Sequence, residues 1–137
     1  MIRFRGSSRS SELNLLLDTH ALLWLLDGDE RVPDWLRSIS EDNASNHLIV
    51  SDVSLWEIAI KSSLGRLDVP DDLPEHLDAT GMNGLSIKRS HLWKVRSLEF
   101  HHNDPFDRLL VAQALLEDLT LVSRDRDLAA YGVSLRW

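Results

Sequence analysis

The sequence contains no cysteine, and only four prolines and one tyrosine, in 137 residues. The absence of cysteine excludes disulfide bonds and thiolate metal sites. The longest apolar stretch, Ala21 to Leu26, follows the polar residues Asp18, Thr19 and His20 and is too short to cross a bilayer. The chain also lacks a Gly-rich phosphate loop, a nucleophile elbow and a Ser-His-Asp grouping. These absences exclude a disulfide scaffold, a membrane span and several common catalytic classes.

Positive charge is also scarce. The formal net charge of −7 argues against a general basic surface for nucleic acid, although bound cations can reverse the field inside an acidic site. The apolar fraction of 43% and charged fraction of 27% are typical of a soluble globular domain. No signal-peptide pattern opens the chain, so a cytoplasmic location is expected. We expect residues 1–12 to form a mobile N-terminal arm and residues 13–137 to form a single domain.

Apolar runs with strand and helix periods alternate along the chain. Strands are predicted over 13–17, 48–51, 85–87, 120–122 and 133–135, and helices over 19–26, 33–40, 53–64, 73–79, 90–98, 105–116 and 128–131. The expected inward-facing residues of two helices are Val53, Trp56, Ile60 and Leu64 in the first, and Leu92, Trp93 and Val95 in the second. The alternation predicts a three-layer α/β/α sandwich on a mainly parallel sheet.

Four short acidic segments lie beside these apolar runs. They are Leu15-Leu-Leu-Asp18, Ser54-Leu-Trp-Glu57, Asp104-Pro-Phe-Asp107-Arg and Leu121-Val-Ser-Arg-Asp125. Ligands of open parallel sheets bind beyond the carboxyl ends of the strands, and all four segments can reach that edge. Carboxylates are preferred ligands of Mg²⁺ and Mn²⁺, and they repel one another when they converge without a cation. The pattern therefore points to metal-assisted hydrolysis, with a phosphodiester as the favoured substrate.

Each acid also has an ordinary structural interpretation. Asp18 can cap the helix that follows it, and Asp104 with Asp107 matches a capping arrangement at a helix start. Glu57 lies three residues after Ser54, as in a capping box, or can pair with a lysine one turn later. An Asp in the turn around residue 125 is common. Taken together these interpretations are less persuasive, because every acid falls at the same predicted edge.

Basic and imidazole side chains near the acids offer weaker signals. His101 and His102 can bind a softer metal, but no Cys or H-x₃-H spacing supports zinc. Arg108, Arg124 and Arg126 flank the acids and can hold phosphates, although exposed solvated arginine is the more common case.

Four motifs together resemble those of the PIN-domain ribonucleases, specifically the VapC-type toxins of bacterial toxin–antitoxin pairs. They are Leu15-Leu-Leu-Asp-Thr-His-Ala-Leu-Leu-Trp24, Val50-Ser-Asp-Val-Ser-Leu-Trp-Glu-Ile-Ala-Ile-Lys61, Asp104-Pro-Phe-Asp-Arg-Leu-Leu-Val-Ala-Gln-Ala114 and Leu121-Val-Ser-Arg-Asp125. The resemblance covers about residues 13–137. It implies a PIN-like fold and a Mg²⁺- or Mn²⁺-dependent endoribonuclease that hydrolyses RNA, is held inactive by a cognate antitoxin and forms a homodimer.

The resemblance also implies roles for individual residues. Asp18, Glu57, Asp107 and Asp125 match the four acidic positions that bind one or two cations and carry catalysis. Three further residues are supporting candidates, with Asp127 also an alternative fourth acid: Asp104, Ser123 and Asp127. The arm departs from the family, whose members usually begin at the first strand.

Two other classes of protein are alternatives to the metal-dependent ribonuclease at the level of the sequence. One is a metal-free or weakly active PIN-like interaction module, which would lack Mg²⁺ affinity. The other is a phosphotransfer domain, which is disfavoured because the haloacid-dehalogenase type needs an acid where His20 stands. The receiver type needs paired N-terminal acids and a late lysine after a strand, and neither is present.

Overall fold

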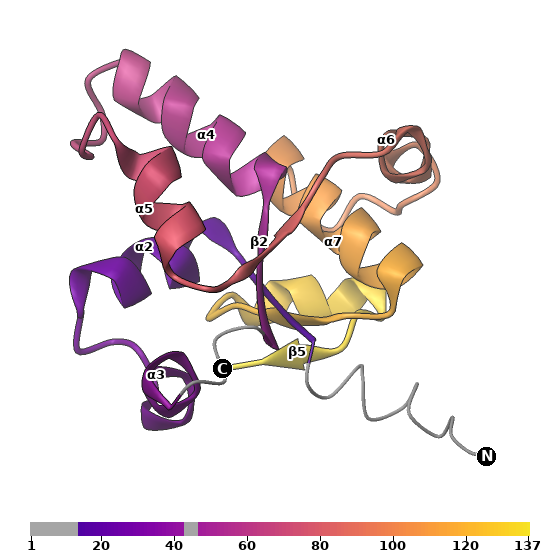
Figure 1. The fold of residues 1–137 in the computed structure, drawn as a ribbon. Coiled ribbons are helices and arrows are strands. Elements are labelled where there is room, and N and C mark those ends of the chain that lie inside the picture. Colours follow the sequence, from indigo (N-terminus) through magenta and orange to yellow (C-terminus); the bar gives the residue numbers. More distant parts are fainter. Residues whose placement is uncertain (1–13, 43–46) are drawn as a thin grey trace.

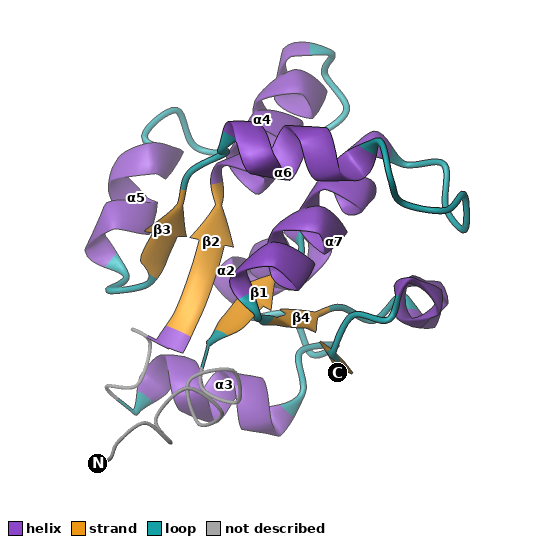
Figure 2. Ribbon diagram, turned by 90° about the vertical axis from the view of Figure 1, so that its right-hand side faces the viewer, coloured by secondary structure: helices purple, strands orange, loops and turns teal. Residues whose placement is uncertain are grey.

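A five-stranded parallel sheet forms the centre of the computed structural model, which describes residues 14–42 and 47–137. The strands are β1 (Leu15–Leu17), β2 (Leu48–Ser51), β3 (Asn83–Leu85), β4 (Thr120–Val122) and β5 (Leu135–Arg136). Their order is β3-β2-β1-β4-β5, and Figure 2 shows β3, β2, β1 and β4 side by side. Every pairing is parallel, which confirms the predicted sheet. The arm expected over residues 1–12 lies outside the described residues.

Helices cover both faces of the sheet. They are α2 (Thr19–Asp27), α3 (Asp34–Glu41), α4 (Asp52–Ser63), α5 (Leu73–Ala79), α6 (Arg89–Val95) and α7 (Pro105–Glu117), with a 3₁₀ helix, η2, over Arg126–Tyr131. Helices α2, α3 and α5 lie to one side of the strands, and α6 and α7 lie to the other (Figure 1). The predicted three-layer sandwich is therefore confirmed. In the described part of the chain, no helix combines the length and the apolar character that crossing a membrane requires.

The central strand divides the core between these two faces. Leu15 and Leu17 belong to the cluster with Leu22 of α2, whereas Leu16 belongs to the cluster with Leu110 of α7. All three strand leucines are at most 1% exposed. Because successive strand residues point to opposite faces, a continuous apolar run is what a strand covered on both sides requires.

Polar residues at the carboxyl edge of the sheet start the helices. Asp18 directly follows β1 and caps α2, with its Oδ1 accepting the Ala21 N–H at 2.8 Å. Ser51 ends β2 and caps α4, with its Oγ accepting the Val53 N–H at 3.0 Å. Each cap satisfies a backbone donor that the first helical turn leaves without a partner. Short strand-to-helix connections therefore place both helix N-termini, with their positive dipole ends, at one edge.

The predicted buried face of α4 is wrong in part. Val53 is buried, but Trp56 is 50% exposed and Leu64 is 59% exposed, while Ser54 and Glu57 point inward. Ser54 Oγ accepts a hydrogen bond from Thr19 Oγ1 at 3.0 Å. The inner face of α4 is thus partly polar because it meets the carboxyl edge of the sheet rather than its apolar surface.

Two further predictions on the β3–α6 side are corrected. β3 covers Asn83–Leu85 rather than 85–87, since β2 pairs Ile49 with Asn83. In α6, Trp93 is 69% exposed and Leu92 is 54% exposed, whereas His91 is fully buried. The His91 Nδ1 accepts the Lys88 N–H at 3.0 Å, so the histidine completes the start of its own helix. Both differences have the same cause: apolar periodicity gives little signal for an edge strand such as β3 or for a buried polar residue such as His91.

Candidate metal and catalytic site

An open cleft of about 500 Å³ lies at the carboxyl edge of the sheet. Its lining comes from the ends of β1 and β4, from α2, and from the start of α7: Asp18, His20, Trp24, His102, Asp104, Asp107, Arg124 and Asp125. The structure therefore brings three of the four predicted acids, Asp18, Asp107 and Asp125, into one cleft.

Asp18 is a buried carboxyl group, with only 5% of the residue exposed. Burial raises its pKa above the ordinary value, because removal from water disfavours the charged form. Hydrogen bonds from Ser123 and from the Ala21 backbone oppose this rise, while the negative charge of Glu57 adds to it. Ser123 Oγ also accepts the Asp125 N–H at 3.0 Å, so this predicted supporting residue connects two of the acids.

Asp107 lies in the first turn of α7, and its side chain is 21% exposed. Burial, followed by the negative charges of Asp104 and Asp18, raises the pKa of Asp107 to about 7. A cation would reverse both causes, since it replaces lost hydration and neutralises the neighbouring charges. The group is therefore poised to exchange a proton for a cation near neutral pH.

Glu57 is 3% exposed, and its two oxygens have different surroundings. Oε2 accepts a hydrogen bond from Lys61 Nζ at 2.6 Å, an i, i+4 ion pair that the sequence anticipated. Oε1 is buried and finds no hydrogen-bond donor among the described residues. Because a buried acceptor without a partner costs roughly 1–3 kcal/mol, this oxygen is suited to a cation or to one of its water ligands. The charge of Glu57 raises the pKa of both Asp18 and Asp107, which places it at the same centre.

His102 joins the acids, although sequence reasoning gave it little weight. Its Nε2 lies 3.0 Å from Asp125 Oδ2 and 3.5 Å from Asp107 Oδ2. Its Nδ1 accepts the Asp104 N–H at 3.1 Å, so the ring hydrogen lies on Nε2 and is donated to Asp125. A protonated Nε2 has no lone pair for a metal. His102 therefore orients an acid in this arrangement instead of serving as the soft-metal ligand considered from sequence.

The remaining acids occupy distinct positions. Asp104 is the N-cap of α7, with its Oδ1 accepting the Phe106 N–H at 2.8 Å and the Asp107 N–H at 3.1 Å. Asp127 is exposed, and its backbone N–H donates to Asp125 Oδ1 at 3.0 Å. Only Asp125 of this pair lines the cleft, which favours it as the fourth acid.

Arg108 is an anchor within the fold and not a phosphate-holding side chain. It is 6% exposed, and its guanidinium donates to the carbonyl of Glu99 at 2.8 Å and to the Tyr131 hydroxyl at 3.0 Å. It also donates to the carbonyls of Val95 and Leu98, both at 3.3 Å. These bonds hold the segment that carries His102 into the cleft.

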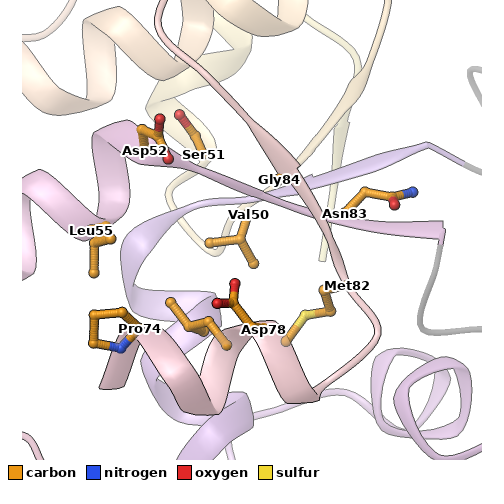
Figure 3. A pocket seen from close by; sticks show the side chains of 10 residues that line it. Val50, Ser51, Asp52, Leu55, Pro74, Asp78, Met82, Asn83 and Gly84 are labelled. Carbon is orange, nitrogen blue, oxygen red and sulfur yellow. The ribbon is translucent and has the colours of Figure 1, made fainter. Parts of the chain in front are cut away.

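A smaller hollow of about 120 Å³ lies between β2, β3 and α5. Figure 3 shows Val50, Asp78 and Met82 directed toward the same space. Typical ligand pockets measure about 300–1,000 Å³, so this hollow is too small for a nucleotide. The acidic cleft is the better functional candidate.

The comparisons with known proteins agree with this geometry. The family model of the PIN domain matches residues 15–133, and the chain therefore belongs to the PIN domain family. No curated protein matches the sequence.

Several solved structures have the same fold as this chain. DNA-bound VapBC from Salmonella typhimurium is 14% identical, with a TM-score of 0.68 and coverage of 90% of this chain and 96% of that chain. A toxin–antitoxin complex from Klebsiella pneumoniae is 14% identical, with a TM-score of 0.59 and coverage of 90% and 96%. FitAcB from Neisseria gonorrhoeae is 23% identical, with a TM-score of 0.61 and coverage of 88% and 95%. At these identities the likeness shows the fold.

The raised pKa of Asp107 predicts a pH-dependent effect on metal-free stability. The unfolded chain loses this proton near pH 4, whereas the folded protein keeps it until about pH 7, so folding stability falls between these values as pH rises. Asp107→Asn removes the penalty and should stabilise the metal-free protein by roughly 2–4 kcal/mol at pH 8, with little effect near pH 4. Urea denaturation in EDTA at both pH values measures this.

Asp71→Asn, at an exposed position, is the matched control and should change stability little at either pH. Equal effects of Asp107→Asn on stability at pH 4 and pH 8 would contradict the raised pKa of Asp107.

Proposed function

We propose that this protein is a Mg²⁺- or Mn²⁺-dependent endoribonuclease that acts as the toxin of a toxin–antitoxin pair. The observation that carries the proposal is the unpartnered buried Oε1 of Glu57 beside two carboxyl groups, Asp18 and Asp107, whose pKa values are raised. Three carboxyl groups at one buried edge need a positive charge, and their oxygens match the ligand preference of hard divalent cations. Membership of the PIN domain family supports the nuclease activity, and the VapBC and FitAcB structures support the toxin role and, through the resemblance, the RNA substrate.

Each residue of the site has its own role in the proposed hydrolysis. Asp18, Glu57 and Asp107 would hold the cation, and Asp125 would complete the site directly or through water. A bound divalent cation would neutralise charge on the phosphate and increase the acidity of the attacking water. Lys61 balances one Glu57 oxygen and leaves the other for this role. In the reaction the water oxygen forms a bond to phosphorus as the bond to the leaving ribose oxygen breaks.

The surrounding helices contribute to substrate binding. The N-termini of α2 and α7 carry the cleft residues Asp18 and Asp107, and their positive dipole ends favour an anionic phosphate once the carboxylates are neutralised. Ser123 and His102 fix the orientation of Asp125 through its backbone N–H and its Oδ2.

One observation favours the alternative of a metal-free interaction module. Lys61 pairs with Glu57 and offsets part of the negative charge, and the neutral His102 ring donates a hydrogen bond to Asp125, so the protein itself partly stabilises these carboxylates. The two functions differ in a simple measurement, because a metal-free module would show no saturable Mn²⁺ binding and no metal-dependent rise in melting temperature.

The two acids of the Asp104-Pro-Phe-Asp107 segment should differ in function. Asp107→Asn should abolish Mn²⁺-dependent RNA cleavage while leaving the fold intact, because it removes a proposed cation ligand. Asp104→Asn should keep most activity, since Asn also caps helices well. Its pH profile should move to lower pH, because Asp104 contributes to the raised pKa of Asp107. Cleavage of a fluorescent RNA, with circular dichroism as the folding control, measures both. Equal loss from both substitutions would show that this division is wrong.

We also propose a cognate antitoxin and a homodimer. An apolar groove of about 310 Å³ between α2 and α5, which includes Leu23, Leu26 and Leu73, offers a surface for an amphipathic helix. An Arg or Lys of the same partner would fit the acidic cleft and compete with the cation. Light scattering during size-exclusion chromatography measures the homodimer.

The groove generates a specific prediction for the antitoxin. Leu26 is 37% exposed at the groove, and Leu26→Glu should weaken capture of the co-expressed neighbouring small protein without reducing RNA cleavage by the free enzyme. Leu116→Glu, on α7 and 46% exposed, is the matched control and should leave capture intact. The toxin–antitoxin interpretation fails if the wild-type proteins do not copurify, or if the complex cleaves RNA as fast as the free protein.

A further inference from the structure

A basic hollow of about 390 Å³ adjoins the acidic cleft. We call it the arginine pocket; its lining is Ser123, Arg124, Arg126, Leu135, Arg136 and Trp137. Arg124 lines both hollows. Trp137 of the arginine pocket packs edge-on against Trp24 of the acidic cleft, with 5.7 Å between ring centroids. The two hollows therefore form one continuous surface across the ends of β4 and β5.

The charge of this pocket stands out in a chain of net charge −7. Arg124, Arg126 and Arg136 are all exposed, and within the described ranges none of the three lies in a salt bridge. The carboxylate of the neighbouring Asp125 is directed elsewhere, since it accepts hydrogen bonds from His102 and from the Asp127 backbone. Three guanidinium groups thus gather at one hollow whose lining, among the described residues, includes no Asp or Glu side chain.

The pocket is partly preorganised by aromatic side chains. The guanidinium carbon of Arg136 lies 3.8 Å from the ring centroid of Trp35, within stacking distance, whereas that of Arg124 lies 6.0 Å from the Trp24 centroid, at the limit of a cation–π contact. Stacking restrains a guanidinium in a plane and leaves its N–H edges available to donate. Less side-chain freedom is then lost when an anion binds.

We propose that the arginine pocket binds a phosphate of the RNA strand next to the phosphodiester that is cleaved. This inference rests on the proposed ribonuclease function and names the part of the protein that holds the substrate. Arginine donates paired hydrogen bonds to phosphate oxygens, and a volume of about 390 Å³ lies within the size range of ligand pockets and is enough for one nucleotide. The pocket offsets the repulsion that the neighbouring acids exert on the rest of the strand. Arg124, shared by both hollows, marks the path from one to the other.

The test is the salt dependence of RNA binding. In an Asp107→Asn background, which should bind RNA without cleaving it, fluorescence anisotropy with a short single-stranded RNA gives Kd over a range of KCl concentrations. Arg126→Ala should weaken binding about tenfold, because a charge-assisted contact is lost. It should also reduce the slope of log K against log salt by about 0.7, the value for one phosphate contact on a single strand.

Arg136→Lys is a second variant, which keeps a positive charge at position 136. It should keep the salt slope but weaken binding, since an ammonium cannot reproduce the paired, stacked contact of a guanidinium. Arg66→Ala is the matched control, because Arg66 is exposed and follows α4 in the chain, and α4 lies away from β5 (Figure 1). It should change neither the affinity nor the slope.

Steady-state cleavage in the unmodified background separates the two proposals. Arg126→Ala should raise KM about tenfold and leave kcat unchanged, as expected for a contact that is made equally in the substrate complex and in the transition state. If the wild-type protein cleaves RNA and Arg126→Ala matches it in Kd, salt slope and KM, the arginine pocket is not the RNA site. If the wild-type protein neither binds nor cleaves RNA, the proposed function itself fails and this inference falls with it.

Discussion

The convergence of buried carboxyl groups at one sheet edge is the constraint on which the rest of this structure depends. Asp18 and Glu57 are nearly inaccessible to water. Burial and acidic neighbours raise the pKa of Asp107 to about 7. Burying a charged carboxylate is unfavourable unless the group is protonated or a positive charge lies beside it. The fold keeps them there because each lies at or near the start of a helix whose position the parallel sheet determines.

Anchors outside the cleft maintain this arrangement. Ser51, the cap of α4, donates a hydrogen bond of 2.5 Å to Gln113 of α7, which joins the helix of Glu57 to the helix of Asp107. Arg108 holds the segment before α7 through backbone carbonyls, and that segment supplies His102 to Asp125. The Ser51–Gln113 bond is buried and the other two contacts are partly buried, so leaving any of these donors without an acceptor would cost free energy. The acidic edge is consequently held in place by the fold and is not a chance grouping of surface charge.

Much of this arrangement follows from the sequence, and the exceptions have physical causes. The run Leu15–Leu17 predicts a strand covered on both faces, and Asp18 directly after it must then lie at the carboxyl edge. The buried face of α4 was mispredicted because Ser54 and Glu57 face the polar edge, which apolar periodicity does not register. His102 was undervalued because its role comes from two contacts that the chain forms only when folded, with the Asp104 N–H and with Asp125. The arginine pocket combines Arg124 and Arg126 with Arg136 of the last strand, and only the pairing of β4 with β5 brings them together.

The most direct test of the central claim is an anomalous-scattering map from crystals of the protein grown with millimolar Mn²⁺. We expect a manganese peak within coordinating distance of Asp18 and Asp107, with the free Oε1 of Glu57 facing the ion directly or through one water. Asp107→Asn crystals in the same condition should lose the peak. The absence of manganese from this cleft in the wild-type protein, with Glu57 Oε1 still without a partner, would show that these carboxyl groups do not form a cation site.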